Sequence, residues 1–131
     1  MFLPVPVIYG LVLLFYVASV YIHYLVLKKR IPFTSINGGR SKTFEEQVKV
    51  SKQSIFILGI LCIYVLATLI FPDFRKSLVF LIATSLLILF WLFGTVLQIL
   101  GTRFEKRVVV WINLLGVISH ILLMLNYFSV T

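Results

Sequence analysis

The chain has 131 residues, of which 61% are hydrophobic and only 12% are charged. A soluble domain averages about 45–50% apolar and about 25% charged residues, so this composition excludes an ordinary soluble domain. It predicts one integral membrane domain over residues 1–131. The formal charge is +8, but the basic residues flank apolar segments and form no face with base-reading groups, which argues against nucleic-acid binding.

Four apolar segments predict an all-α integral membrane fold, a bundle of four transmembrane helices. Each segment has roughly 18 or more residues without an acid or base, the length that a spanning helix needs. The expected helices cover residues 4–27, 43–71, 77–101 and 108–128. No small-residue cleavage site follows the first segment, so we take it as a retained helix.

The second predicted helix combines a charged start with an apolar remainder. Thr43 and Glu46 have the spacing of a capping box, and Pro72 disfavours helical geometry at the residue before it. Residues 43–71 would reach roughly 43 Å at about 1.5 Å per residue, which exceeds the bilayer's hydrocarbon core of about 30 Å. The first turns, with Lys49 and Lys52, should therefore stand in water.

The basic residues also predict the orientation. Ten of the twelve lie in the first and third connections, and the positive-inside rule places these two connections in the cytoplasm and both termini outside. The ten are Lys28, Lys29, Arg30, Arg40, Lys42, Lys49, Lys52, Arg103, Lys106 and Arg107. Residues 36–39, Ile-Asn-Gly-Gly, predict a flexible turn, and no lysine-serine pair follows them to make a phosphate-binding loop.

Three polar residues within the apolar segments fall at one depth. Helix rise places His23, Gln98 and Asn113 within roughly 5–8 Å of the cytoplasmic boundary. They form either hydrogen bonds between helices or a functional polar layer, and the sequence leaves both interpretations open. His120 lies roughly 11 Å deeper than His23, so one ion cannot bind both, and we predict no metal site. The single cysteine, Cys62, excludes an intramolecular disulfide.

The second segment opens with Phe44 and Glu45, followed by Lys49 and Gln53. With four helices, an outside N-terminus and a basic first connection, the chain resembles the MAPEG family, the membrane-associated proteins of eicosanoid and glutathione metabolism. That family's second helix opens with phenylalanine and glutamate, then has an arginine, an asparagine and a glutamate-tyrosine pair. Lys49 stands in place of the arginine and Gln53 in place of the asparagine. Residues 56–57, Phe-Ile, replace the final pair.

The third helix shows the same mixture of matches and departures. Gly94 and Gly101 match the family's frame glycines, whereas Thr95 replaces an arginine and Gln98 replaces a tyrosine or histidine. Arg107 is the nearest match to an arginine that opens the family's fourth helix and activates the glutathione thiol.

The resemblance implies a homotrimer with clefts between subunits, at the cytoplasmic half, for glutathione or a lipid. A lysine cannot reproduce the bidentate fork with which arginine holds a carboxylate, so we expect transferase activity to be weak or lost. The residues that would still bind a cofactor or an anionic head group are Lys49, Lys52, Gln53, Gln98, Arg103 and, if the chain is an enzyme, the catalytic Arg107.

Three functions follow from these patterns. The first is a structural or accessory subunit, or a binder of an anionic lipid or cofactor at a cytoplasmic-side cleft. The second is an active glutathione transferase-like enzyme, in which Arg107 activates a thiol and Lys49 holds a carboxylate. The third is an unrelated small channel, holin or immunity-type protein. The expected partners are the lipid bilayer and either further copies of the chain or a larger membrane complex.

Overall fold

The computed structural model describes residues 3–129, and these residues are all-helical. The four long helices are α1 (Val5–Leu27), α2 (Phe44–Ile70), α3 (Leu78–Ile99) and α4 (Val110–Ser129). By length and composition, all four are suited to crossing a membrane, which confirms the four apolar helices predicted from the sequence.

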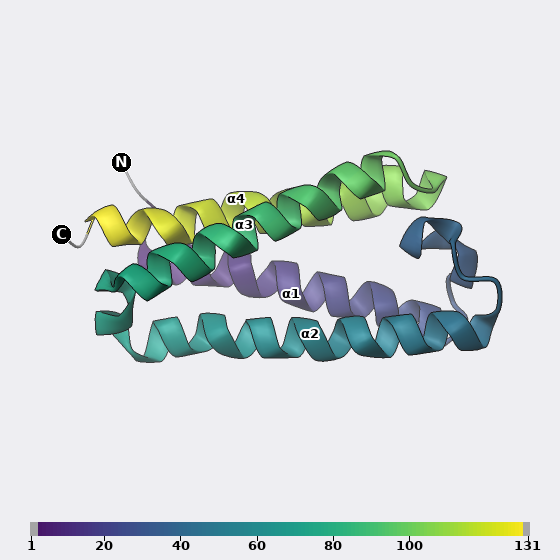
Figure 1. Cartoon of the computed structure of the whole chain (residues 1–131), viewed down its shortest axis with the longest axis horizontal. Coiled ribbons are helices and arrows are strands. Elements are labelled where there is room, and N and C mark those ends of the chain that lie inside the picture. Colours follow the sequence, from purple (N-terminus) through teal and green to yellow (C-terminus); the bar gives the residue numbers. More distant parts are fainter. Residues whose placement is uncertain (1–2, 130–131) are drawn as a thin grey trace.

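The helices pack in the order α2, α1, α4, α3 (Figure 1). α1 contacts both α2 and α4, and α4 contacts α3, whereas α2 and α3 barely touch. The connections at residues 28–43 and 100–104 lie at one end, which we call the basic end. The start of α1, the end of α4 and the short helix η3 (Pro72–Lys76) lie at the other, the far end. This arrangement leaves one side of the bundle open between α2 and α3.

The two central helices cross closely at a glycine. The side chain of Phe15 on α1 is fully buried against Gly116 on α4. A Cβ atom at Gly116 would stand 2.6 Å from Cε1 of Phe15, closer than side-chain atoms approach one another. The absence of a side chain at Gly116 therefore sets the separation of α1 and α4.

The buried His120 is fully used in this same crossing. Its Nδ1 lies 2.6 Å from the Gly116 carbonyl oxygen, and its Nε2 lies 2.9 Å from the Tyr16 hydroxyl. Because a carbonyl only accepts, Nδ1 carries the hydrogen and Nε2 accepts from Tyr16. Nδ1 bonds within α4, because Gly116 lies one turn before His120, whereas Nε2 joins α4 to Tyr16 on α1.

The start of α2 is capped in a slightly different way from the predicted box. The Thr43 hydroxyl accepts from the Glu46 amide at 3.2 Å, as predicted. The Glu46 carboxylate, however, accepts from the Lys42 amide at 2.7 Å, one residue before the cap. α2 ends at Ile70, followed by Phe71 and Pro72.

Removal of the α2 cap should weaken the fold modestly. Thr43→Ala leaves the Glu46 amide without its acceptor, and we expect it to lower the free energy of unfolding by about 1 kcal/mol. Denaturant titration of the detergent-solubilised protein measures this loss. Thr43→Ser keeps the hydroxyl and should restore stability, and a serine variant as weak as the alanine variant would contradict the capping role.

The fourth helix begins earlier than predicted. Residues 103–104 are already helical, and a π-helical turn, η4 (Glu105–Val109), leads directly into α4. The Thr102 hydroxyl accepts from the Glu105 amide at 3.2 Å, and the Glu105 carboxylate accepts from the Thr102 amide at 3.1 Å. This reciprocal capping box starts the helix. The prediction that Arg103, Lys106 and Arg107 lie in a loop is therefore wrong, because they occupy the first turns of the helix.

Candidate functional site

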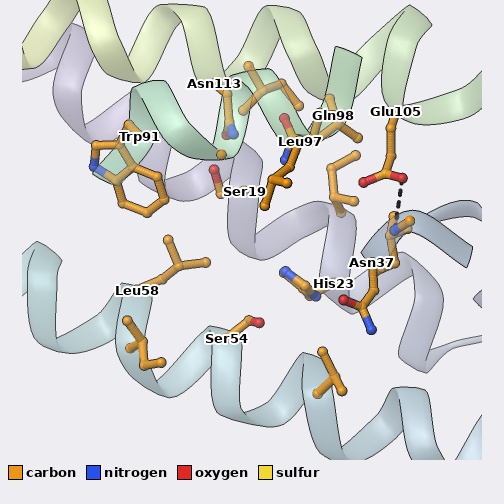
Figure 2. Close-up of a pocket in the computed structure, with 18 of the residues that line it drawn as sticks. Ser19, His23, Asn37, Ser54, Leu58, Trp91, Leu97, Gln98, Glu105 and Asn113 are labelled. Carbon is orange, nitrogen blue, oxygen red and sulfur yellow. Dashed lines mark hydrogen bonds between the residues drawn. The ribbon is translucent and has the colours of Figure 1, made fainter. Parts of the chain in front are cut away.

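A cavity of about 350 Å³ lies inside the half of the bundle next to the basic end. α2 and α3 form its walls, and side chains of α1 and α4 also line it (Figure 2). Residues 36–40 of the first connection close it at the basic end. Its volume falls within the range of about 300–1,000 Å³ that is usual for small-molecule sites.

The open side of this cavity, between α2 and α3, is apolar. Four side chains at the opening, Ile57, Phe90, Phe93 and Leu97, are each more than 40% exposed. Ile57 and Phe90 also line a second, wholly apolar hollow with Leu61, Leu86 and Leu87, so the two spaces adjoin. An apolar groove thus runs from the cavity toward the far end.

The groove is closed beyond these leucines by a hydrogen bond between the two walls. The hydroxyls of Tyr64 on α2 and Thr84 on α3 lie 2.9 Å apart. The walls are therefore tied together near the far end and separate toward the basic end.

Two amide side chains leave hydrogen-bonding positions open on the cavity wall. Asn113 is only 6% exposed, its side chain has no hydrogen bond within residues 3–129, and it points into the cavity in Figure 2. Gly94 makes room for it, since a Cβ there would stand 3.1 Å from Nδ2 of Asn113. Oε1 of Gln98 is likewise buried without a partner in the described chain. Buried amides are normally hydrogen-bonded, and the Asn113 amide, which is accessible from the cavity, suits a polar ligand.

His23 reaches the same cavity from α1 and is held by a chain of hydrogen bonds. Its Nδ1 lies 2.9 Å from the Ser51 hydroxyl oxygen, which accepts from Nε2 of Gln47 at 2.9 Å. The Gln47 carbonyl in turn accepts from the Ser41 hydroxyl at 2.7 Å. Nε2 of His23 makes no hydrogen bond to any described residue and remains available on the cavity side.

Glu105 supplies the only carboxylate on the cavity wall in residues 3–129. It is 5% exposed, and Oε1 accepts from the amides of Gly38 at 3.0 Å and Thr102 at 3.1 Å. The other oxygen has no hydrogen bond to a described residue and faces the cavity in Figure 2. Gly38 has a φ of 64°, a left-handed conformation that glycine adopts readily. The predicted flexible turn is thus held to the bundle by Glu105.

Arg40 is the only arginine on the described cavity wall, and it lies at the basic end. Its guanidinium donates to Oδ1 of Asn37 at 3.1 Å and lies over Gly38. Within residues 3–129, the only ion pair joins Lys76 to Asp73, so no carboxylate pairs with Arg40. The guanidinium keeps donors available for a ligand.

The structure separates the predicted site residues into two sets. His23, Gln98 and Asn113 all line the cavity. The remaining predicted residues are exposed and do not line it; they are Lys49, Lys52, Gln53, Arg103 and Arg107. The described residues contain no cluster of three metal-ligating side chains.

Sequence reasoning missed the two ionised side chains of the cavity, Arg40 and Glu105. The sequence does contain a pattern that indicates a structured position for Glu105, because Thr102 and Glu105 have capping-box spacing before an apolar run. No such pattern marks Arg40, since the first connection reaches the cavity only by folding back onto the distant Glu105 and Thr102.

The comparisons with known proteins leave the family resemblance as an expectation. No family model, curated protein or solved structure matches the chain.

Proposed function

We propose that this chain is a multi-pass membrane protein that binds one lipid-like amphiphile in its cavity. The polar head lies among the residues of the basic end, and the apolar chain lies in the groove between α2 and α3. The basic end faces the cytoplasm under the positive-inside rule, because it carries ten of the twelve Lys and Arg residues.

The observation that carries this proposal is the Asn113 amide, which has no hydrogen bond within residues 3–129 and is directed into a cavity whose open side is apolar. The amide is accessible from the cavity and can hydrogen-bond a ligand placed there. A ligand that fits supplies hydrogen-bonding groups at the basic end and apolar surface along α2 and α3. A lipid-like amphiphile has both.

The position of the opening also favours a ligand from the bilayer. Exposed apolar side chains frame the opening between α2 and α3, whereas residues 36–40 lie across the basic end. A ligand dissolved in water would have to pass this connection. A lipid can enter sideways between the two helices.

The transferase-like alternative receives no support from this geometry. Arg107, the predicted thiol-activating residue, is exposed and does not line the cavity, and neither does Lys49.

A bulky side chain within the cavity tests the proposal. Ser54 lines the cavity from α2, and Ser54→Phe would occupy the space of the ligand. Native mass spectrometry should show one bound phospholipid on wild-type protein after incubation with phosphatidylethanolamine and phosphatidylglycerol. We expect about tenfold less bound lipid on the variant, which corresponds to about 1.4 kcal/mol.

Gly59→Phe is the matched control. Gly59 lies on the same helix, and a Cβ atom added to it would meet no atom within 4 Å, so phenylalanine there fills open space. This control should bind lipid like the wild type. Equal binding by Ser54→Phe and wild type would contradict the proposed function.

A further inference from the structure

A negatively charged and a positively charged side chain line the cavity at the turn around Gly38, and they do not form an ion pair. Glu105 and Arg40 are the only Asp, Glu, Lys or Arg residues on the described cavity wall. Both contact Gly38: its amide donates to Oε1 of Glu105 at 3.0 Å, and the Arg40 guanidinium lies over it. They nevertheless form no ion pair. One ligand with two linked charges can reach both.

The Glu105 side of this turn offers hydrogen-bond acceptors. One Glu105 oxygen is used by two backbone amides, and the other faces the cavity without a partner in residues 3–129. A carboxylate withdrawn from water needs a compensating charge and hydrogen-bond donors. A primary ammonium supplies both.

The Arg40 side offers donors at the basic end of the cavity. Within residues 3–129 the Arg40 guanidinium makes one hydrogen bond, to Asn37, and its planar shape matches the oxygens of a phosphate. A phosphate here would lie near the surface, with the ammonium turned inward toward Glu105.

We propose that the bound amphiphile carries a zwitterionic head in which a phosphate is linked to a primary ammonium, as in phosphatidylethanolamine. Arg40 binds the phosphate, and Glu105 binds the ammonium. This inference rests on the proposed lipid-binding function. It replaces the anionic head group expected from the sequence, because Lys49, Lys52, Arg103 and Arg107 do not line the cavity.

A series of head groups on identical acyl chains tests the inference on the wild-type protein. Delipidated protein is incubated with an equimolar mixture of phosphatidylethanolamine, its mono- and dimethylated forms, phosphatidylcholine and phosphatidylglycerol. Native mass spectrometry then counts each lipid adduct. Phosphatidylethanolamine should exceed phosphatidylcholine and phosphatidylglycerol about tenfold, and binding should fall as methyl groups replace the N–H donors.

Two isosteric variants assign the preference to Glu105. Glu105→Gln keeps a carbonyl acceptor for the backbone amides but loses the charge, and it should bring phosphatidylethanolamine and phosphatidylglycerol to parity. Asp73→Asn removes an exposed acid at the far end and should leave the preference intact.

The outcomes separate this inference from the proposed function. Equal binding of all five lipids, or a preference for phosphatidylglycerol, overturns the zwitterionic head group if Ser54→Phe still excludes the lipid. A preference that persists in folded Glu105→Gln also overturns it. If Ser54→Phe binds lipid like the wild type, the proposed function itself fails. Should Glu105→Gln not fold, the wild-type lipid series decides.

Discussion

Leucine in place of Gly116 is expected to lower the free energy of unfolding by about 3 kcal/mol, the upper part of the usual range for overpacking. The first added carbon alone would stand 2.6 Å from the ring of Phe15, which is fully buried and cannot swing away. α1 and α4 must then separate, which also strains the His120–Tyr16 hydrogen bond. Denaturant titration in detergent measures the change.

The control for this substitution is Gly59→Leu, which adds the same side chain where nothing lies within 4 Å. Gly59 is exposed on α2, so the added leucine meets only the surroundings of the helix. We expect its free energy of unfolding to stay near that of the wild type. If both variants lose the same stability, helix composition and not the α1–α4 crossing would explain the loss.

The helices could be predicted because their signals are local. Hydropathy over successive segments gives the four spans, and Thr43 with Pro72 brackets α2 to within a residue of its observed ends. Composition places the start of the fourth helix too late, because the charged Arg103, Lys106 and Arg107 are typical of a loop. The capping box of Thr102 and Glu105 overrides that composition.

The candidate site was only partly predictable, because depth along a helix follows from sequence spacing but the direction of a side chain does not. Helix rise predicts one level for His23, Gln98 and Asn113, and all three line the cavity. The position of a residue around the helix axis decides whether its side chain faces the cavity or the surroundings. On α2, Lys49 and Gln53 are exposed, and Ser54 lines the cavity.

The turn around Gly38, which carries Arg40 and contacts Glu105, depends on contacts that no sequence pattern predicts. Gly38 and Glu105 are 67 residues apart in the chain, yet the amide of one donates to the carboxylate of the other. Thr102 adds a second link by donating to the Ser35 carbonyl. Two glycines in the first connection predict flexibility, and only the folded bundle supplies the groups that hold them.

Glu105→Ala should release this first connection. The change removes the acceptor of the Gly38 amide and that of the Thr102 amide, and each lost hydrogen bond to a charged group is worth about 1.5–3 kcal/mol. Residues 33–41 should then open more often. Hydrogen–deuterium exchange in detergent should show their amides exchanging at least about tenfold faster, while amides in the middle of α1 and α4 change little.

The control, Asp73→Ala, distinguishes this anchoring from a general effect of lost negative charge. Asp73 is an exposed acid whose only ion pair is to Lys76 at the far end, so its loss should leave exchange in residues 33–41 unchanged. Unchanged exchange in Glu105→Ala would mean that the other contacts hold the connection, among them the buried Ile36 and the Thr102–Ser35 hydrogen bond. Faster exchange in Glu105→Ala alone would show that the carboxylate that caps the fourth helix also holds the first connection against the basic end of the cavity.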